Sequence, residues 1–88
     1  MKKKILIVED NVGLSQMQKD WFSQAGYEAV TAMNEPIARS LIRKTQFDLI
    51  LSDVRLPEGD GISLLEWLRK EKKDIPFIIT TEYVSVPD

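Results

Sequence analysis

The sequence predicts an α/β fold: a doubly wound parallel sheet with helices on both faces. Short apolar runs alternate along the chain with stretches whose apolar residues follow helical spacing, which gives the order βαβαβαβ. The run at residues 5–8 is continuously apolar, as is typical of a strand covered on both faces. A chain of 88 residues is expected to form a single domain, and its parallel strands should be joined by right-handed crossovers.

The first strand and the first helix have clear sequence signals. Residues 5–8 are a continuous apolar run and should form the strand. Asn11 is placed to cap a helix over residues 12–25, and Gly26 suits the C-terminal end of that helix. The apolar residues of the helix recur at helical spacing; they are Leu14, Met17, Trp21, Phe22 and Ala25. Of these, Trp21 and Phe22 are expected to be core or half-buried rather than an interaction surface.

A second strand is expected at residues 27–31, and a second helix should follow it. Asn34 precedes Glu35 and Pro36, which is the order of an N-cap, an acidic first turn and a proline near the helix start. Apolar residues then recur at helical spacing, which predicts one stripe facing the core. The stripe consists of Ile37, Ala38, Leu41 and Ile42.

Two further strands are expected, at residues 47–52 and at residues 77–80. Residues 56–61 are rich in Pro, Gly and Asp, which predicts a loop after the third strand. A third helix should follow over residues 62–72, with Trp67 partly exposed. Its buried stripe is expected to be Ile62, Leu65 and Leu68.

Composition narrows the class of protein. The chain is 43% hydrophobic and 30% charged, as soluble globular domains are, and its net charge of -2 argues against direct nucleic-acid contact. The absence of cysteine excludes disulfides and thiolate metal sites. Lys2–Lys4 is followed only by the short apolar run of residues 5–8, which is too short for a signal peptide or a membrane span. We therefore expect a cytoplasmic protein without membrane contact.

Polar residues follow three of the expected strands. The first strand ends in Glu9 and Asp10, the third in Asp53, and the fourth in Thr80 and Thr81. Ligands of such sheets bind at the carboxyl ends of the strands. One acidic strand end usually only caps a helix or faces solvent, but two carboxylates about 5 Å apart repel by roughly 3 kcal/mol at an effective dielectric near 20. Three carboxylates gathered here therefore predict a cation, and all-oxygen ligation favours Mg²⁺.

The order and spacing of these segments resemble the receiver domains of two-component response regulators. The resemblance is carried by Val8–Asn11, by Asp48–Pro57 with Gly61 after it, and by Pro76–Ile79 leading to Thr81. It extends over the whole chain. It implies a flavodoxin-like fold with the strand order 2-1-3-4, in a bacterial signalling protein.

The resemblance also implies a role for each site residue. Asp53 would be the phosphoacceptor and a Mg²⁺ ligand, and it would take the phosphoryl group from a sensor histidine kinase. Asp10 would bind Mg²⁺ directly, Glu9 mainly through water, and Arg55 through its backbone carbonyl. Thr81 would be the switch hydroxyl. Such a domain is not an enzyme but a phosphoacceptor that assists its own phosphorylation and dephosphorylation, and it signals to an output domain or partner protein, often in transcription regulation.

Two departures from the family pattern affect these expectations. Glu82 stands where the family usually has a small residue. The characteristic Lys at the end of a fifth strand has no counterpart before Asp88, so residues 1–88 are expected to be a receiver that lacks the last helix, strand and helix. The strand at residues 77–80 would then lie at an edge of the sheet, where it could pair with a second copy of the chain in a homodimer.

Two other functions are alternatives to that of a phosphoacceptor. A pseudo-receiver would act only in protein interaction or dimerisation; Asp53 and the acidic pair argue against it, and the missing Lys argues for it. An aspartate-nucleophile phosphatase would carry a second acid two residues after the acid that ends its first strand. Here the residue two positions after Asp10 is Val12, which argues against that class.

Overall fold

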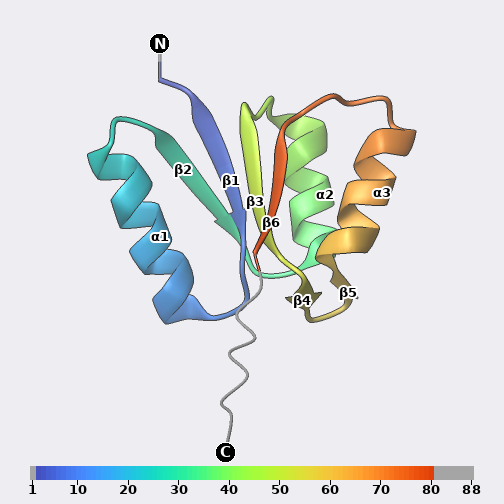
Figure 1. Ribbon diagram of the computed structural model, residues 1–88, viewed down its shortest axis with the longest axis horizontal. Coiled ribbons are helices and arrows are strands. Elements are labelled where there is room, and N and C mark those ends of the chain that lie inside the picture. The colour runs from blue at the N-terminus through green and yellow to red at the C-terminus, as the bar shows by residue number, and fades with distance from the viewer. Residues whose placement is uncertain (1, 81–88) are drawn as a thin grey trace, which may run out of the picture.

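The computed structural model describes residues 2–80 and consists of a parallel sheet between two layers of helices (Figure 1). The strands run in the order β2-β1-β3-β6, and every neighbouring pair in this sheet is parallel. This confirms the doubly wound fold and the order 2-1-3-4, since β6 is the fourth strand of the sheet. The sheet consists of β1 (Lys4–Val8), β2 (Glu28–Ala32), β3 (Leu49–Asp53) and β6 (Phe77–Thr80), the helices are α1 (Val12–Gln24), α2 (Glu35–Lys44) and α3 (Gly61–Lys70), and a small hairpin pairs β4 (Arg55–Leu56) with β5 (Gly59–Asp60).

The two predicted helix caps are confirmed. The Asn11 side chain accepts a hydrogen bond from the Leu14 backbone N–H at 2.9 Å, and the Asn34 side chain accepts one from the Ile37 N–H at 2.9 Å. After α1 the chain turns through Gly26, whose φ of +95° lies in the region that glycine tolerates best. These caps fix where α1 and α2 leave the carboxyl end of the sheet, because they satisfy backbone N–H groups that have no partner within the helix.

The strand limits differ slightly from the prediction, with one functional consequence. β2 begins and ends one residue later than the expected range of 27–31. β3 covers Leu49–Asp53 rather than 47–52, because its pairing with β1 begins at Leu49 and its pairing with β6 continues to Asp53. Asp53 therefore belongs to the strand and is held by the hydrogen bonding of the sheet.

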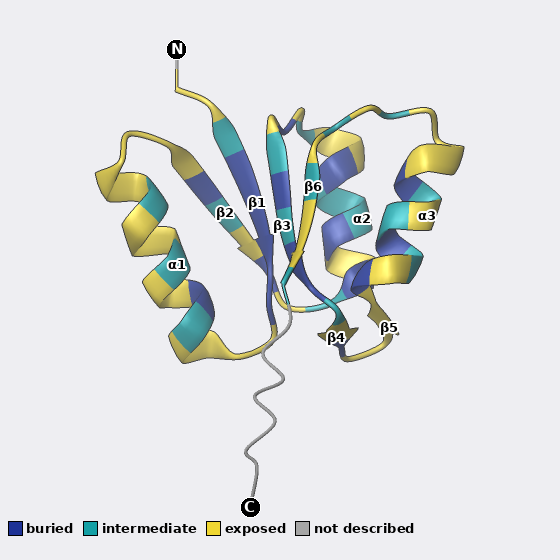
Figure 2. Ribbon diagram, viewed as in Figure 1, coloured by how far each residue is buried: buried dark blue, intermediate teal, exposed yellow. Residues whose placement is uncertain are grey.

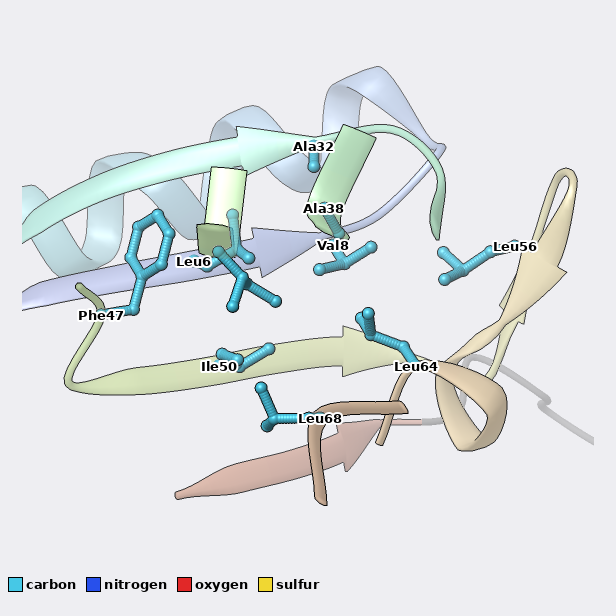
Figure 3. Close-up of a cluster of buried hydrophobic side chains, with 10 residues drawn as sticks. Leu6, Val8, Ala32, Ala38, Phe47, Ile50, Leu56, Leu64 and Leu68 are labelled. Atoms are coloured by element: carbon cyan, nitrogen blue, oxygen red, sulfur yellow. The ribbon is translucent and has the colours of Figure 1, made fainter. Parts of the chain in front are cut away.

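The two faces of the sheet carry different amounts of core. α1 covers one face, and α2 and α3 cover the other (Figure 1). The core on the α1 face is small: Ile5, Ile7 and Ala29, with Phe22 and Leu49 packed against them. The core on the other face is larger and is drawn in Figure 3; it consists of Leu6, Val8, Ala32, Ala38, Ile42, Phe47, Ile50, Leu56, Leu64 and Leu68.

The burial expected for Trp21 is wrong, and two other apolar residues of α1 are exposed with it. Met17 and Trp21 are 44% and 60% exposed, and Ala25 is exposed as well. Figure 2 shows most of α1 as exposed. Leu14 is half-buried and Ser15 is buried, and Phe22 is the residue of α1 that packs against the small cluster. The half-burial expected for Phe22 is confirmed.

The stripes predicted for α2 and α3 are corrected as well. Ala38 and Ile42 are buried, but Ile37 is 40% exposed and the charged Glu35 is buried in its place. α3 begins at Gly61 and ends at Lys70, and its buried residues are Gly61, Leu64 and Leu68. Ile62 is 51% exposed and Leu65 is half-buried, because the sheet-facing side of α3 is rotated by one residue from the expected stripe. Trp67 is partly exposed, as expected.

Residues 56–61 are not a simple loop. Arg55 pairs with Asp60 and Leu56 pairs with Gly59 in an antiparallel hairpin. Residues 57–58 form its turn, in which proline precedes Glu58 at a φ of +54°. Leu56 is only 9% exposed and belongs to the larger core cluster, so the hairpin is attached to the domain by an apolar side chain (Figure 3). Among residues 2–80, no helix has the length and apolar character needed to cross a membrane.

Candidate functional site

Three carboxylates meet at the carboxyl end of the sheet. Glu9 and Asp10 follow β1 directly, and Asp53 ends β3. Each of them offers an oxygen atom, and these oxygens all lie within 4.8 Å of one another. Glu9 and Asp53 are buried at 3% and 4% exposure, whereas Asp10 is exposed. The structure thus brings together the acids that the sequence places at the ends of two neighbouring strands.

Backbone N–H groups orient the two buried carboxylates. Oε2 of Glu9 accepts a hydrogen bond from the Asn11 N–H at 3.0 Å, and Oδ1 of Asp53 accepts one from the Arg55 N–H at 3.3 Å. The Glu9 N–H donates to the Ala32 carbonyl at 2.9 Å, which extends the pairing of β1 with β2. The acids are therefore fixed by the segments in which each strand leaves the sheet.

The charge of this cluster favours a bound cation. Carboxylates about 5 Å apart repel by roughly 3 kcal/mol at an effective dielectric near 20, and burial of two of them removes much of the water that would offset this repulsion. All the side-chain ligands are oxygens, and the exposed Asp10 leaves one side open to water and substrate. Mg²⁺ prefers oxygen ligands and keeps several of its waters. The residues present therefore fit a small, hard divalent cation.

The remaining predicted site residues lie beside this cluster or outside the described residues. Arg55 opens β4, two residues after Asp53, and its backbone N–H donates to Oδ1 of Asp53. Thr81 and Glu82 lie outside residues 2–80. Thr80 pairs with Asp53 in the sheet, and its hydroxyl donates to the Ser52 carbonyl at 3.4 Å. The Thr80 hydroxyl is thus hydrogen-bonded to the backbone of β3.

Two features near the site were missed in the sequence. The Ser52 hydroxyl donates to the Asp53 carbonyl at 2.9 Å, which stiffens the end of β3. A Cβ added to Gly61 would lie 2.5 Å from the Asp53 carbonyl oxygen and 3.0 Å from Oγ of Ser52, so glycine permits the first turn of α3 to contact the end of β3. Gly59 and Gly61 were the sequence signal for such close backbone contacts, but composition alone predicted only that this segment is a loop.

Comparison with known proteins agrees with this geometry. The model of the response regulator receiver domain family matches residues 5–88. The polar-differentiation response regulator DivK of Brucella anthropi is 36% identical over 90 aligned residues, which cover 100% of this chain and 73% of DivK. The probable transcriptional regulator ycf27 of Cyanophora paradoxa is 37% identical over 87 residues, which cover 99% of this chain and 36% of that protein.

Solved structures show the same likeness. The non-phosphorylated receiver domain of HemR from Leptospira biflexa has a TM-score of 0.86 and 38% identity, with 97% of this chain and 68% of that chain covered. The response regulator TrrA of Thermotoga maritima, solved in complex with Mg²⁺-BeF, has a TM-score of 0.87 and 32% identity, with 92% of this chain and 70% of that chain covered. The fold, the acidic end of the sheet and these similarities agree: the chain belongs to the response regulator receiver domain family of two-component systems.

Proposed function

We propose that this receiver domain accepts a phosphoryl group on Asp53 from the phosphohistidine of a sensor histidine kinase, and that it then alters an output domain or partner protein. The observation that carries the proposal is the grouping of Glu9, Asp10 and Asp53, whose carboxylate oxygens lie within 4.8 Å of one another at the carboxyl end of the sheet. Two of these acids are buried and fixed by backbone N–H groups, as an attacking carboxylate and its neighbours would need to be.

The transfer is a substitution at phosphorus. An oxygen of Asp53 forms a bond to phosphorus, the bond from phosphorus to the kinase histidine nitrogen breaks, and the imidazole leaves with a proton. The product is an acyl phosphate on Asp53, which water can later hydrolyse back to carboxylate and phosphate. Since a carboxylate and a phosphoryl group repel each other, the main tasks of the site are positioning and stabilisation of charge.

The site residues suit Mg²⁺ as the source of that stabilisation. Asp10 and Asp53 would bind the ion directly, Glu9 mainly through water, and Arg55 through its backbone carbonyl. When bound, Mg²⁺ would supply positive charge beside the transferring oxygens. The relative TrrA was solved in complex with Mg²⁺-BeF, which supports the choice of Mg²⁺ as the ion.

Thr81 is proposed as the hydroxyl that contacts the phosphoryl oxygens and reports phosphorylation. Its support is its place in the sequence. It directly follows Thr80, which is paired with Asp53 across β3 and β6. Because the Thr80 hydroxyl already donates to the Ser52 carbonyl, the next residue is the better candidate for a switch.

Intact-mass analysis tests the proposal. The protein is mixed with a small acyl phosphate and Mg²⁺, quenched in acid after increasing times and weighed. We expect one phosphoryl adduct in the wild type, none without Mg²⁺, and none in Asp53→Ala. The same adduct in Asp53→Ala would exclude Asp53 as the acceptor. A folded wild-type protein that never gains an adduct would favour the pseudo-receiver, which acts through protein interaction alone.

A further inference from the structure

We propose that Glu35 is a positioning residue for the phosphoacceptor site, because its buried carboxylate fixes the β4–β5 hairpin that follows Asp53. Glu35 lies on α2, outside the acidic cluster, and the sequence marked it only as an acidic residue in a first turn. The inference rests on the proposed function, because its purpose is to place the backbone that borders Asp53.

Glu35 is a buried charge with partners on three segments. It is only 4% exposed. Its carboxylate accepts hydrogen bonds from the Asp60 backbone N–H at 3.1 Å and from the Ser63 hydroxyl at 3.3 Å, and it forms an ion pair with the Arg39 guanidinium. A buried carboxylate is costly unless such partners replace its water. Its bonds therefore connect α2 with both the hairpin and the first turn of α3.

The hairpin backbone packs directly on the Glu35 side chain. Gly59 has a φ of +135°, and a Cβ built there would lie 2.1 Å from Oε1 of Glu35 and 2.9 Å from its Cβ. Atoms cannot approach so closely, so no larger residue fits at position 59 unless Glu35 or the hairpin moves. The backbone of Gly59 and the side chain of Glu35 are thus in close van der Waals contact, which requires glycine at position 59.

Two short links connect this contact to the phosphoacceptor. Asp60, whose N–H donates to Glu35, pairs with Arg55 across the hairpin. The Arg55 N–H in turn donates to Oδ1 of Asp53 at 3.3 Å. The Arg55 carbonyl is the proposed backbone ligand of Mg²⁺. A hairpin that shifts away from Glu35 would therefore move both a hydrogen-bond donor to Asp53 and a metal ligand.

The cation that pairs with Glu35 is itself held against α3. The Arg39 guanidinium lies over the Trp67 ring, 5.2 Å from its centroid, and the Arg43 guanidinium lies over the same ring at 5.2 Å. Cations are attracted to the face of an indole ring. The pair is thus anchored to α2 and α3 together, and Glu35 has little freedom to follow a moving hairpin.

A purely structural role makes a different prediction. An acidic residue in a first turn stabilises its helix through the helix dipole. If Glu35 acts only in this way, its removal lowers the stability of the whole domain but leaves the hairpin of the folded protein in place. Local protection of the hairpin and affinity for Mg²⁺ therefore separate the two roles, provided that a control variant reproduces the loss of global stability.

The experiment compares the full chain with Glu35→Ala, Glu35→Gln and the control Ile42→Ala. Ile42 is buried on the same helix at 3% exposure and belongs to the apolar core. Amide hydrogen exchange is measured without metal, Mg²⁺ affinity is measured by calorimetry, and global stability is measured by denaturant unfolding. In Glu35→Ala we expect the Asp60 amide to exchange roughly tenfold faster than global stability explains and Mg²⁺ to bind about tenfold more weakly.

The control and the conservative variant complete the test. Ile42→Ala should lose global stability while its Asp60 protection, corrected for that loss, and its Mg²⁺ affinity stay at wild-type values. Glu35→Gln should show a smaller loss of protection than Glu35→Ala, since its amide oxygen can still accept from the Asp60 N–H. This variant decides the question if Glu35→Ala does not fold.

Two further results distinguish failure of the positioning role from failure of the proposed function. If the Glu35 variants lose stability but keep corrected Asp60 protection and Mg²⁺ affinity at wild-type values, the positioning role is wrong. If the wild-type protein binds no Mg²⁺, the proposed function fails, but metal-free exchange at Asp60 still shows whether Glu35 fixes the hairpin.

Discussion

The two faces of the sheet differ in the number of buried apolar residues that pack on them. On the face covered by α2 and α3, ten buried residues form one cluster that reaches from Phe47 at one end of the sheet to Leu56 in the hairpin. On the face covered by α1, the cluster has three buried residues among residues 2–80, and the exposed side of α1 includes Met17 and Trp21. Figure 2 shows this difference as buried segments on α2 and α3 and a mostly exposed α1.

This difference indicates which contacts hold the site residues in place. Asp53 is bordered by the β4–β5 hairpin and by the start of α3, and both belong to the heavily packed half through Leu56 and Leu64. Glu9 and Asp10 are placed instead by the turn from β1 into α1, where Asn11 supplies one hydrogen bond to Glu9 and the cap of the helix. Local hydrogen bonds thus orient the acids of both segments, and the Asp53 segment is bordered in addition by the packed hairpin and the start of α3.

The largest expected effect compares one leucine on each face. Leu64 on α3 is 0% exposed, whereas Leu14 on α1 is half-buried. Leu64→Ala should lower the free energy of unfolding by about 3–4 kcal/mol, since it opens a cavity in the larger cluster. Leu14→Ala should cost about 1–2 kcal/mol, since less of its area is buried. Denaturant unfolding of both variants measures the difference, and equal losses would show that the faces contribute alike.

A smaller effect compares two glycines at helix starts. Gly61→Ala places a methyl group 2.5 Å from the Asp53 carbonyl oxygen, whereas the Cβ of Gly13→Ala meets only Oδ1 of Asn11 at 3.5 Å. We expect Gly61→Ala to cost about 1–3 kcal/mol and Gly13→Ala to be neutral or to stabilise by about 0.5–1 kcal/mol, since alanine favours the helix. Thermal unfolding measures both variants.

The same comparison extends to the site. Because the methyl group of Gly61→Ala pushes on the end of β3, this variant should also weaken Mg²⁺ binding, while Gly13→Ala should leave it unchanged. A Gly61→Ala protein with wild-type stability and Mg²⁺ affinity would mean that the start of α3 does not constrain Asp53.

The smallest effect compares the two tryptophans. Trp67 packs against the larger cluster under the guanidinium groups of Arg39 and Arg43, and Trp67→Ala should cost about 1–2 kcal/mol. Trp21 is 60% exposed, and Trp21→Ala should change stability by less than about 0.5 kcal/mol. A large loss from Trp21→Ala in unfolding measurements would show that α1 is packed more firmly than its exposure indicates.

The sequence predicted the fold well because its signals are local. Short, mostly apolar runs alternating with helical stretches marked the four strands of the sheet, and Asn11 and Asn34 marked two helix starts that the structure confirms. Acids at the strand ends were also visible, because a parallel sheet brings carboxyl ends of strands to one edge. Their convergence followed from topology and did not require knowledge of any side-chain contact.

The errors arose where tertiary packing selects among several apolar residues. Met17 and Trp21 have helical spacing, yet α1 covers a cluster too small to bury them. On α3, Leu64 is buried in the larger cluster and Ile62 is exposed, although both are apolar. The burial of Glu35 was invisible in the sequence, because its partners Asp60 and Ser63 are distant along the chain.

A Mg²⁺ titration followed by amide chemical shifts tests the central claim, that the acidic end of the sheet is the metal-dependent phosphoacceptor site. The double variant Asp10→Asn with Asp53→Asn removes two charged ligands, and the control Glu66→Gln with Glu71→Gln removes two exposed charges from α3 and the residue after it. We predict saturable binding in the wild type and the control, with the largest shifts next to Asp53, and nearly none in the double variant, since a hard dication needs charged oxygen ligands. Unchanged affinity in the double variant would contradict the account.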